Sequence, residues 1–134
     1  MIILDTSVWI EFFKNNPGYY PFIKSLLENQ KILALECIFA ELLQGAKNKR
    51  EIDIISLYWD NLPKYIKSNE WIEAGIYSSQ HGLYSKSIGL IDCVIIVSAR
   101  NAKARIWSLD KKLNSVLKKD ELYKGTSIYE NPDF

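Results

Sequence analysis

Two spacings of apolar residues recur along the chain, and they predict two kinds of element. Short apolar runs between polar or turn residues predict buried strands, whereas apolar residues three or four apart predict amphipathic helices. Strands are predicted at residues 1–4, 31–36, 64–67, 105–109 and, weakly, 125–130. Helices are predicted at residues 7–15, 19–29, 37–47, 51–62, 69–85, 90–104 and 110–119. The helix at 90–104 is too apolar to lie on the surface.

The alternation of strands and helices predicts the fold class. Such strands connect through right-handed crossovers into a mainly parallel sheet that helices cover on both faces. With 134 residues, 48% of them hydrophobic, the chain fits one compact domain over residues 1–134, without a linker or an internal repeat. Ligands of open parallel sheets bind beyond the carboxyl ends of the strands. Acidic residues at that edge are therefore the first candidates for chemistry.

Four acidic residues are predicted to meet at the carboxyl edge. Asp5 follows the strand MIIL, and Asp110 follows the strand RIWSL. Glu41 lies about one turn into the helix after KILALE, and Asp92 interrupts the opening turn of the apolar helix LIDCVIIVSA. Each has an ordinary explanation, such as a helix cap, a charge favoured by the helix dipole or a solvent-facing position. Their convergence on one edge instead predicts a functional cluster.

A cluster of four carboxylates needs a cation. Without one, mutual repulsion would force some of them to take up protons. Hard oxygen ligands select Mg²⁺ or Mn²⁺, and such ions bind phosphate oxygens and lower the pKa of water. The predicted reaction is the hydrolysis of a phosphodiester.

The charge distribution suits a polyanionic substrate. The net charge is +1, but setting the four acids aside leaves 12 acidic against 17 basic residues, a balance of +5. Basic residues cluster at Lys47, Lys49 and Arg50, at Arg100, Lys103 and Arg105, and at Lys111, Lys112, Lys118 and Lys119. Any one of these clusters is also typical of a solvated helix face.

Cysteine and histidine usage argues against other kinds of site. Cys37 and Cys93 lack paired metal-ligand spacing, which favours buried free thiols over a disulfide or a zinc site. His81 is the single histidine and is interpreted as a surface or packing residue. No apolar run approaches the ~20 residues of a membrane span, and the N-terminus has no signal-peptide pattern. A cytoplasmic protein is expected.

Four motifs together resemble a known family. In chain order they are LDTSVWI, FAELLQG, GLIDCVIIVSA and WSLD. This set, which spans essentially the whole chain, resembles the PIN-domain family, particularly the VapC-type ribonuclease toxins of toxin–antitoxin systems. The resemblance implies a three-layer α/β/α sandwich around a mainly parallel sheet. It also implies an Mg²⁺- or Mn²⁺-dependent endoribonuclease, a homodimer and inhibition by a small cognate antitoxin.

The resemblance assigns roles to individual residues. The catalytic and metal-binding quartet is Asp5, Glu41, Asp92 and Asp110, with hydrogen-bonding support from Thr6, Ser7 and Ser108. Position in the sequence, rather than the resemblance, suggests the contacts for RNA phosphates. Lys47, Lys49 and Arg50 follow the end of the Glu41 helix, and Lys111 and Lys112 directly follow Asp110, so all five are expected near the quartet.

One departure from the family pattern bears on the metal. Where relatives often read D-x-D-F after the fourth position, this chain reads DKKL, which leaves one or two ions per site open. Glu36 and Glu11 are assigned peripheral positions. The alternative function is a PIN-like module that binds RNA or protein without cutting RNA.

Overall fold

The structure is a computed structural model, and it describes residues 1–125. The strands are β1 (Ile2–Leu4) and β2 (Arg105–Trp107). The α-helices are α1 (Thr6–Phe13), α2 (Tyr20–Glu28), α3 (Glu36–Gln44), α4 (Lys49–Asn61), α5 (Glu70–His81), α6 (Leu90–Ala102) and α7 (Lys111–Ser115). A short 3-10 helix, η1 (Tyr84–Lys86), lies between α5 and α6.

A parallel sheet forms the centre of the fold, as the sequence predicts. β1 and β2 are parallel neighbours, with Leu4 opposite Trp107. Parallel bridges between single residue pairs extend this sheet on both sides, and they join Ile2 to Ile32, Ala34 to Lys64, and Ile106 to Leu122. Five chain segments therefore lie parallel, with β1 and β2 in the middle.

Predicted strands are shorter in the structure: the strand predicted at 105–109 ends at Trp107, and two others are reduced further. The segments at 31–36 and 64–67 contribute only single bridges, and Glu36 already belongs to α3. Within the segment at 31–36, Ile32 is bridged to β1 and Ala34 is bridged to Lys64 on the opposite side. The segment therefore forms no continuous ladder with either neighbour. Pro63 accepts a hydrogen bond from the Ala34 amide but has no N–H to return.

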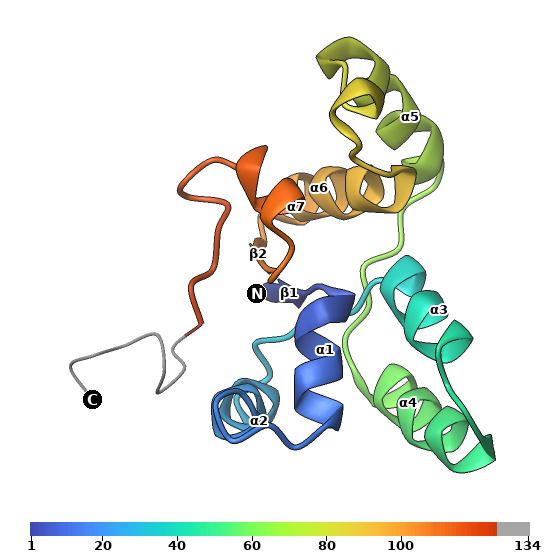
Figure 1. Ribbon diagram of the computed structural model, residues 1–134, viewed down its shortest axis with the longest axis vertical. Coiled ribbons are helices and arrows are strands. Elements are labelled where there is room, and N and C mark those ends of the chain that lie inside the picture. Colours follow the sequence, from blue (N-terminus) through green and yellow to red (C-terminus); the bar gives the residue numbers. More distant parts are fainter. Residues whose placement is uncertain (126–134) are drawn as a thin grey trace.

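Helices cover both faces of the sheet. Figure 1 shows α5, α6 and α7 on one side of the strands and α1, α2 and α4 on the other. The α6 residues 93–99 are all buried, which confirms that this helix belongs to the interior. Cys37 and Cys93 are buried free thiols, as predicted. Among the described residues, no helix is long and apolar enough to cross a membrane.

Helix ends differ from the prediction where the backbone turns. The helix predicted at 69–85 ends at His81, because Gly82 adopts a left-handed conformation (φ 61°) that closes the helix. The helix predicted at 110–119 stops at Ser115, and the chain then turns back so that Leu122 can bridge to β2. The weak strand predicted at 125–130 lies outside the described residues apart from Gly125.

Candidate functional site

The ends of β1 and β2 bring Asp5 next to Ser108. The Asp5 amide donates to the Trp107 carbonyl (3.0 Å), which extends the pairing of the two strands by one residue. Asp5 also caps α1, since its Oδ1 accepts from the Thr6 amide (2.8 Å). Its Oδ2 accepts from the Ser108 hydroxyl (2.7 Å) and from the Ser7 hydroxyl (3.2 Å). The carboxylate is therefore both a helix cap and a fixed point at the strand ends, where it is only 6% exposed.

Glu41 reaches the same place from α3. The Thr6 hydroxyl donates to Glu41 Oε1 (2.8 Å), while the Thr6 amide bonds Asp5. Thr6 thus links the two carboxylates. Because α3 already begins at Glu36, Glu41 lies in the second turn of its helix rather than about the first, as the sequence suggested.

Asp110 is held to the same strand end through Ser108. It caps α7 by accepting from the Lys112 amide (2.9 Å), and its own amide donates to the Ser108 hydroxyl (3.0 Å). Ser7 contributes from the other side, since its hydroxyl accepts from the Leu109 amide (3.1 Å). The three hydroxyl residues singled out from the sequence therefore all bridge the candidate carboxylates or the segment that carries them.

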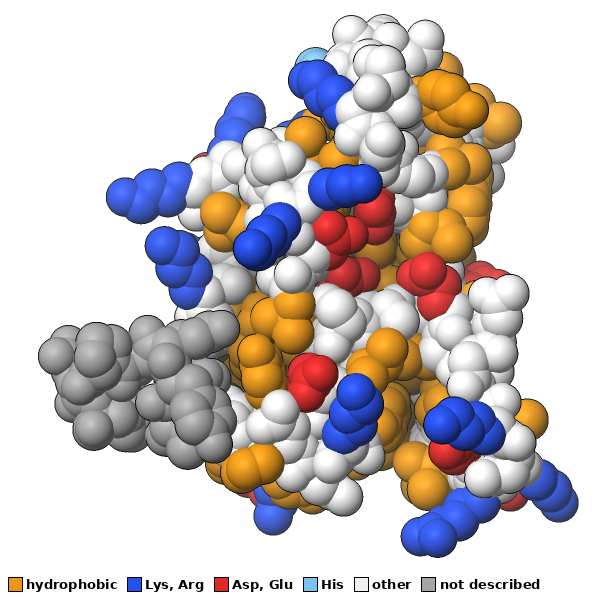
Figure 2. All heavy atoms as spheres, viewed as in Figure 1, with side chains coloured by type: hydrophobic (Ala, Val, Ile, Leu, Met, Phe, Trp, Pro, Cys, Tyr) orange, Lys and Arg blue, Asp and Glu red, His pale blue; other side chains and the backbone are white. Residues whose placement is uncertain are grey.

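Asp92 faces the other three carboxylates from the first turn of α6. Burial, together with the charges of Asp5, Asp110 and Glu41, raises the pKa of Asp92 to about 6. Among the described residues, ion pairs join Lys24 to Glu28, Lys67 to Glu73 and Arg100 to Glu121, and none reaches the four acids. Figure 2 shows acidic side chains gathered near the centre of one face, with basic side chains beside them. The cluster is an uncompensated patch of negative charge.

The chemistry of these donors fits a hard divalent cation. All four side chains offer carboxylate oxygens, and their charges repel one another without a counter-charge. Within residues 1–125, no three acidic, cysteine or histidine side chains converge tightly enough to hold an ion as they stand. Most of their mapped hydrogen bonds instead go to hydroxyls and amides. Binding a cation would require these side chains to turn toward a common point, where the positive charge of the ion would offset their mutual repulsion.

The predicted basic residues lie in two separate places. Lys111 and Lys112 are exposed in the first turn of α7, directly after Asp110. Lys47, Lys49 and Arg50 lie between α3 and the start of α4, and Figure 1 shows this turn at the end of α3 away from the strands. The structure therefore does not bring the five together beside the acidic cluster.

Sequence analysis missed one residue of the site, Asn114. Its side-chain Nδ2 donates to the Ser108 carbonyl (2.9 Å). A signal was present, because asparagine favours caps and turns over helix interiors, and Asn114 stands one turn after Asp110 in a helical stretch.

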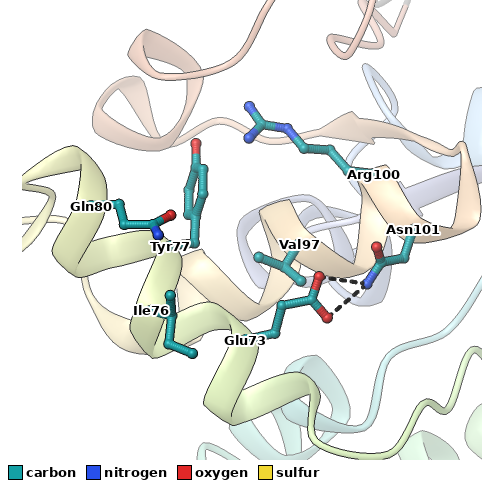
Figure 3. A pocket seen from close by; sticks show the side chains of 7 residues that line it. All are labelled: Glu73, Ile76, Tyr77, Gln80, Val97, Arg100 and Asn101. Atoms are coloured by element: carbon teal, nitrogen blue, oxygen red, sulfur yellow. Dashed lines mark hydrogen bonds between the residues drawn. The ribbon is translucent and has the colours of Figure 1, made fainter.

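A hollow between α5 and α6 is distinct from the acidic cluster. It has a volume of about 320 Å³ and is lined by Glu73, Ile76, Tyr77, Gln80, Val97, Arg100 and Asn101. In Figure 3, Glu73 and Asn101 are hydrogen-bonded to each other (3.3 and 3.4 Å). None of the four candidate acids lines it, and Arg100 lies in the last turn of α6, whereas Asp92 lies in the first.

Comparisons with known proteins agree with this architecture. The sequence profile of the PIN domain matches residues 2–119. A search of curated proteins by sequence found no match.

Solved structures share the fold at low sequence identity. A chain of VapBC2 from Rickettsia felis, bound to a DNA fragment from their promoter, has a TM-score of 0.70 and 20% identity, over 95% of this chain and 100% of that chain. VapC20 from Mycobacterium tuberculosis, described as a sarcin-ricin loop cleaving toxin, has a TM-score of 0.67 and 12% identity, over 86% and 94% of the two chains. A chain of VapBC-1 from nontypeable Haemophilus influenzae has a TM-score of 0.65 and 22% identity, over 86% and 91%.

Proposed function

The chain belongs to the PIN-domain family, and from this premise we propose that it is an Mg²⁺- or Mn²⁺-dependent endoribonuclease, the toxin of a toxin–antitoxin pair. The observation that carries the proposal is the carboxylate cluster. Asp5, Glu41 and Asp110 are held around Thr6 and Ser108, and their charges act on Asp92. The likeness to chains of VapBC complexes and to a sarcin-ricin loop cleaving toxin supports RNA as substrate and an antitoxin as partner. We expect the protein to act in the cytoplasm.

In the proposed mechanism, the four acids bind the ion and the hydroxyl residues hold the acids. A divalent ion bound there stabilises charge on phosphate oxygens and lowers the pKa of water. Thr6, Ser7 and Ser108 hold Asp5, Glu41 and the Asp110 segment near one another before the ion arrives, so that the carboxylate groups would only have to turn toward it. Asp92 must lose its proton for the cluster to reach full charge. Lys111 and Lys112, next to Asp110, bind the RNA backbone.

The decisive test uses Asp92→Asn and Asp5→Asn. Either change keeps the side-chain size but removes one ligand charge, so RNA cleavage should fall at least about 100-fold. Glu11→Gln is the matched control. Glu11 lies toward the C-terminal end of α1, where its side chain accepts a hydrogen bond from Asn16 and takes no part in the cluster. Cleavage is measured on total RNA with Mg²⁺ or Mn²⁺, and folding is checked by circular dichroism. Full activity of either aspartate variant, or undiminished cleavage in excess EDTA, contradicts the proposal.

The ends of the fragments test the same proposal chemically. Ribonucleases that use a histidine pair attack with the 2′-hydroxyl and release a cyclic phosphate. This chain has one histidine, His81, which is exposed and lies against Tyr77 with the two rings tilted and their centroids 4.4 Å apart. In-line attack by water should leave a 5′-phosphate and a 3′-hydroxyl, which mass spectrometry distinguishes from a cyclic phosphate. RNA that is bound but never cut with either ion would favour the alternative, a PIN-like binding module.

We also propose that the protein forms a homodimer through α5. This helix and the segment before it expose Ile66, Trp71, Ile72 and Ile76, at 73%, 49%, 66% and 53%. Figure 2 shows a band of hydrophobic side chains over this part of the molecule. Soluble monomers rarely expose a contiguous apolar patch of this kind. A two-fold axis across α5 would cover the patch of one subunit with the same patch of the other.

A further inference from the structure

The segment between β2 and α7 is held at both ends by one residue, through its side chain at the start of the segment and its backbone amide at the end. Asn114 Nδ2 donates to the carbonyl of Ser108, at the start of the segment (2.9 Å), and the Asn114 amide donates to the carbonyl of Asp110, at its end (3.0 Å). Ser108 directly follows β2, and Asp110 caps α7. The amide bond is the ordinary i→i−4 bond of a helix, so what the asparagine side chain adds is the tie between the end of β2 and the helix that Asp110 caps.

From its other side, the same segment is tied to Asp5. The Ser108 hydroxyl donates to Asp5 Oδ2 and accepts from the Asp110 amide, while the Ser7 hydroxyl accepts from the Leu109 amide. These bonds hold the side chain of Ser108 and the backbone of Leu109 and Asp110. They leave the Ser108 carbonyl to Asn114. The two sets of bonds are thus complementary, and each acts on a different face of the segment.

The orientation of the Asn114 amide follows from its surroundings. Its Oδ1 is buried and has no hydrogen-bond partner among residues 1–125, whereas Nδ2 faces the Ser108 carbonyl. The flipped amide would set two acceptor oxygens against each other and would bury the NH₂ group without a partner, which is worse. α7 has only five residues, and asparagine is a mediocre helix former. Asparagine does not stabilise the helix, and its amide oxygen makes no hydrogen bond among the described residues. The bond from Nδ2 to Ser108 is therefore the contribution of this side chain.

We propose that Asn114 is a positioning residue for Asp110 and, through Asp110, for the divalent cation of the acidic cluster. This inference rests on the proposed function. Asn114 acts through the backbone of Ser108 and Asp110, and it does not bind the ion or the RNA itself. Side chains that orient ligands in this way typically change metal affinity by about 10- to 100-fold when removed.

The test compares Asn114→Ala and Asn114→Asp with the native protein. Alanine removes the amide without changing the charge. Aspartate matches asparagine in size, but it replaces the NH₂ donor with an oxygen that repels the Ser108 carbonyl. If only local charge mattered, Asn114→Asp would bind a cation more tightly. Positioning requires instead that both variants bind Mn²⁺ at least about 10-fold more weakly, as measured by isothermal titration calorimetry on the full chain.

Asn61 provides the matched control. It makes the same kind of bond, from Nδ2 to the Leu57 carbonyl (2.7 Å), at the exposed end of α4. Asn61→Ala and Asn61→Asp should bind Mn²⁺ as the native protein does. For Asn114→Ala, cleavage should recover toward the native rate as Mn²⁺ is raised to saturation, because the ligands themselves are intact. Circular dichroism and a thermal melt recorded without the ion separate weaker binding from a loss of folding, because an ion that binds only the folded state also stabilises it.

Each outcome separates this inference from the proposed function. If the native protein binds Mn²⁺ and both Asn114 variants bind it equally well, the role of Asn114 is refuted and the proposed function stands. Tighter binding by Asn114→Asp also refutes it. If the native protein binds no Mn²⁺ and cuts no RNA, the proposed function itself fails. If both Asn114 variants fail to fold by circular dichroism, Asn114 is a structural residue and the inference is wrong.

Discussion

Asp92 is the residue at which the fold and the proposed chemistry conflict most directly. It lies in the first turn of α6, just before the buried residues 93–99, and its own burial together with three other carboxylates raises its pKa from the ordinary 3.8 to about 6. A raised carboxyl pKa means that the folded protein holds this proton more firmly than the unfolded chain does. The associated stability is fully present below about pH 4 and is lost as the pH rises through about 6.

This linkage predicts an unusual effect of Asp92→Asn on stability. In metal-free protein at pH 8, the change removes a disfavoured charge, so it should stabilise by about 1 kcal/mol after allowance for partial exposure, or about 4 °C in Tm. At pH 4 native Asp92 is protonated, and the difference should disappear. Thermal melts in EDTA from pH 4 to pH 8 measure it, with the exposed Asp53→Asn on α4 as control. An equal Tm for Asp92→Asn and native protein at pH 8 would show that the four acids are not mutually strained.

At the scale of single elements, α7 joins the acidic cluster to a basic surface. Lys111 and Lys112 begin the helix that Asp110 caps, so a phosphate near the proposed ion would also be near two ammonium groups. Lys112 binds the Asp110 carboxylate through its backbone amide, whereas the Lys112 side chain is exposed. Its charge can therefore be removed without breaking the cap.

Lys112→Gln and Lys111→Gln should each weaken RNA binding and flatten its salt dependence. Each lost phosphate contact lowers the slope of log K against log salt by about 0.7 for a single strand. Filter binding of RNA at several salt concentrations, with the catalytically inactive Asp92→Asn background, gives the slope. Lys49→Gln, at the first residue of α4, tests the other predicted group separately. A slope that does not change in the α7 variants would make these lysines ordinary solvated residues.

The elements also show what a single sequence can and cannot specify. β1 and β2 were predictable, because each is an apolar run followed within a few residues by an acid that caps the next helix. The segment KILALE was not a full strand, because Ile32 and Ala34 pair with different neighbours and Glu36 has already entered α3. Such pairing depends on contacts distant in sequence. The periodicity of one segment carries no information about them.

In the candidate site, too, some features could be predicted from the sequence, and others depend on contacts distant in sequence. The order of strands and helices was enough to predict that Asp5, Asp92 and Asp110 would approach one another, since that depends on topology. The bond from Asn114 to Ser108 was not predictable, because it depends on how a five-residue helix turns against the end of β2. The spread of the basic residues depends likewise on the direction of α3, which carries Lys47 away from the strand ends.

At the scale of the whole molecule, the exposed apolar face of α5 and the acidic cluster belong to one structural unit. α5 packs along α6, and α6 carries Asp92 in its first turn. A partner subunit on α5 would therefore support the helix that positions Asp92. The hollow of Figure 3, between the same two helices, includes Ile76 of the exposed face and would lie beside such an interface.

Ile72→Glu should convert the proposed dimer into a monomer. Ile72 is 66% exposed at the middle of the apolar face, and a dimer would bury its carboxylate replacement against the same apolar side chains of the second copy. Light scattering coupled to size-exclusion chromatography measures the mass, which should fall from about twice 15.5 kDa to 15.5 kDa. Leu57→Glu is the control, because Leu57 is 61% exposed but lies on α4, outside this face. If the native protein is a monomer, or if Ile72→Glu remains a dimer, α5 is not the dimer interface.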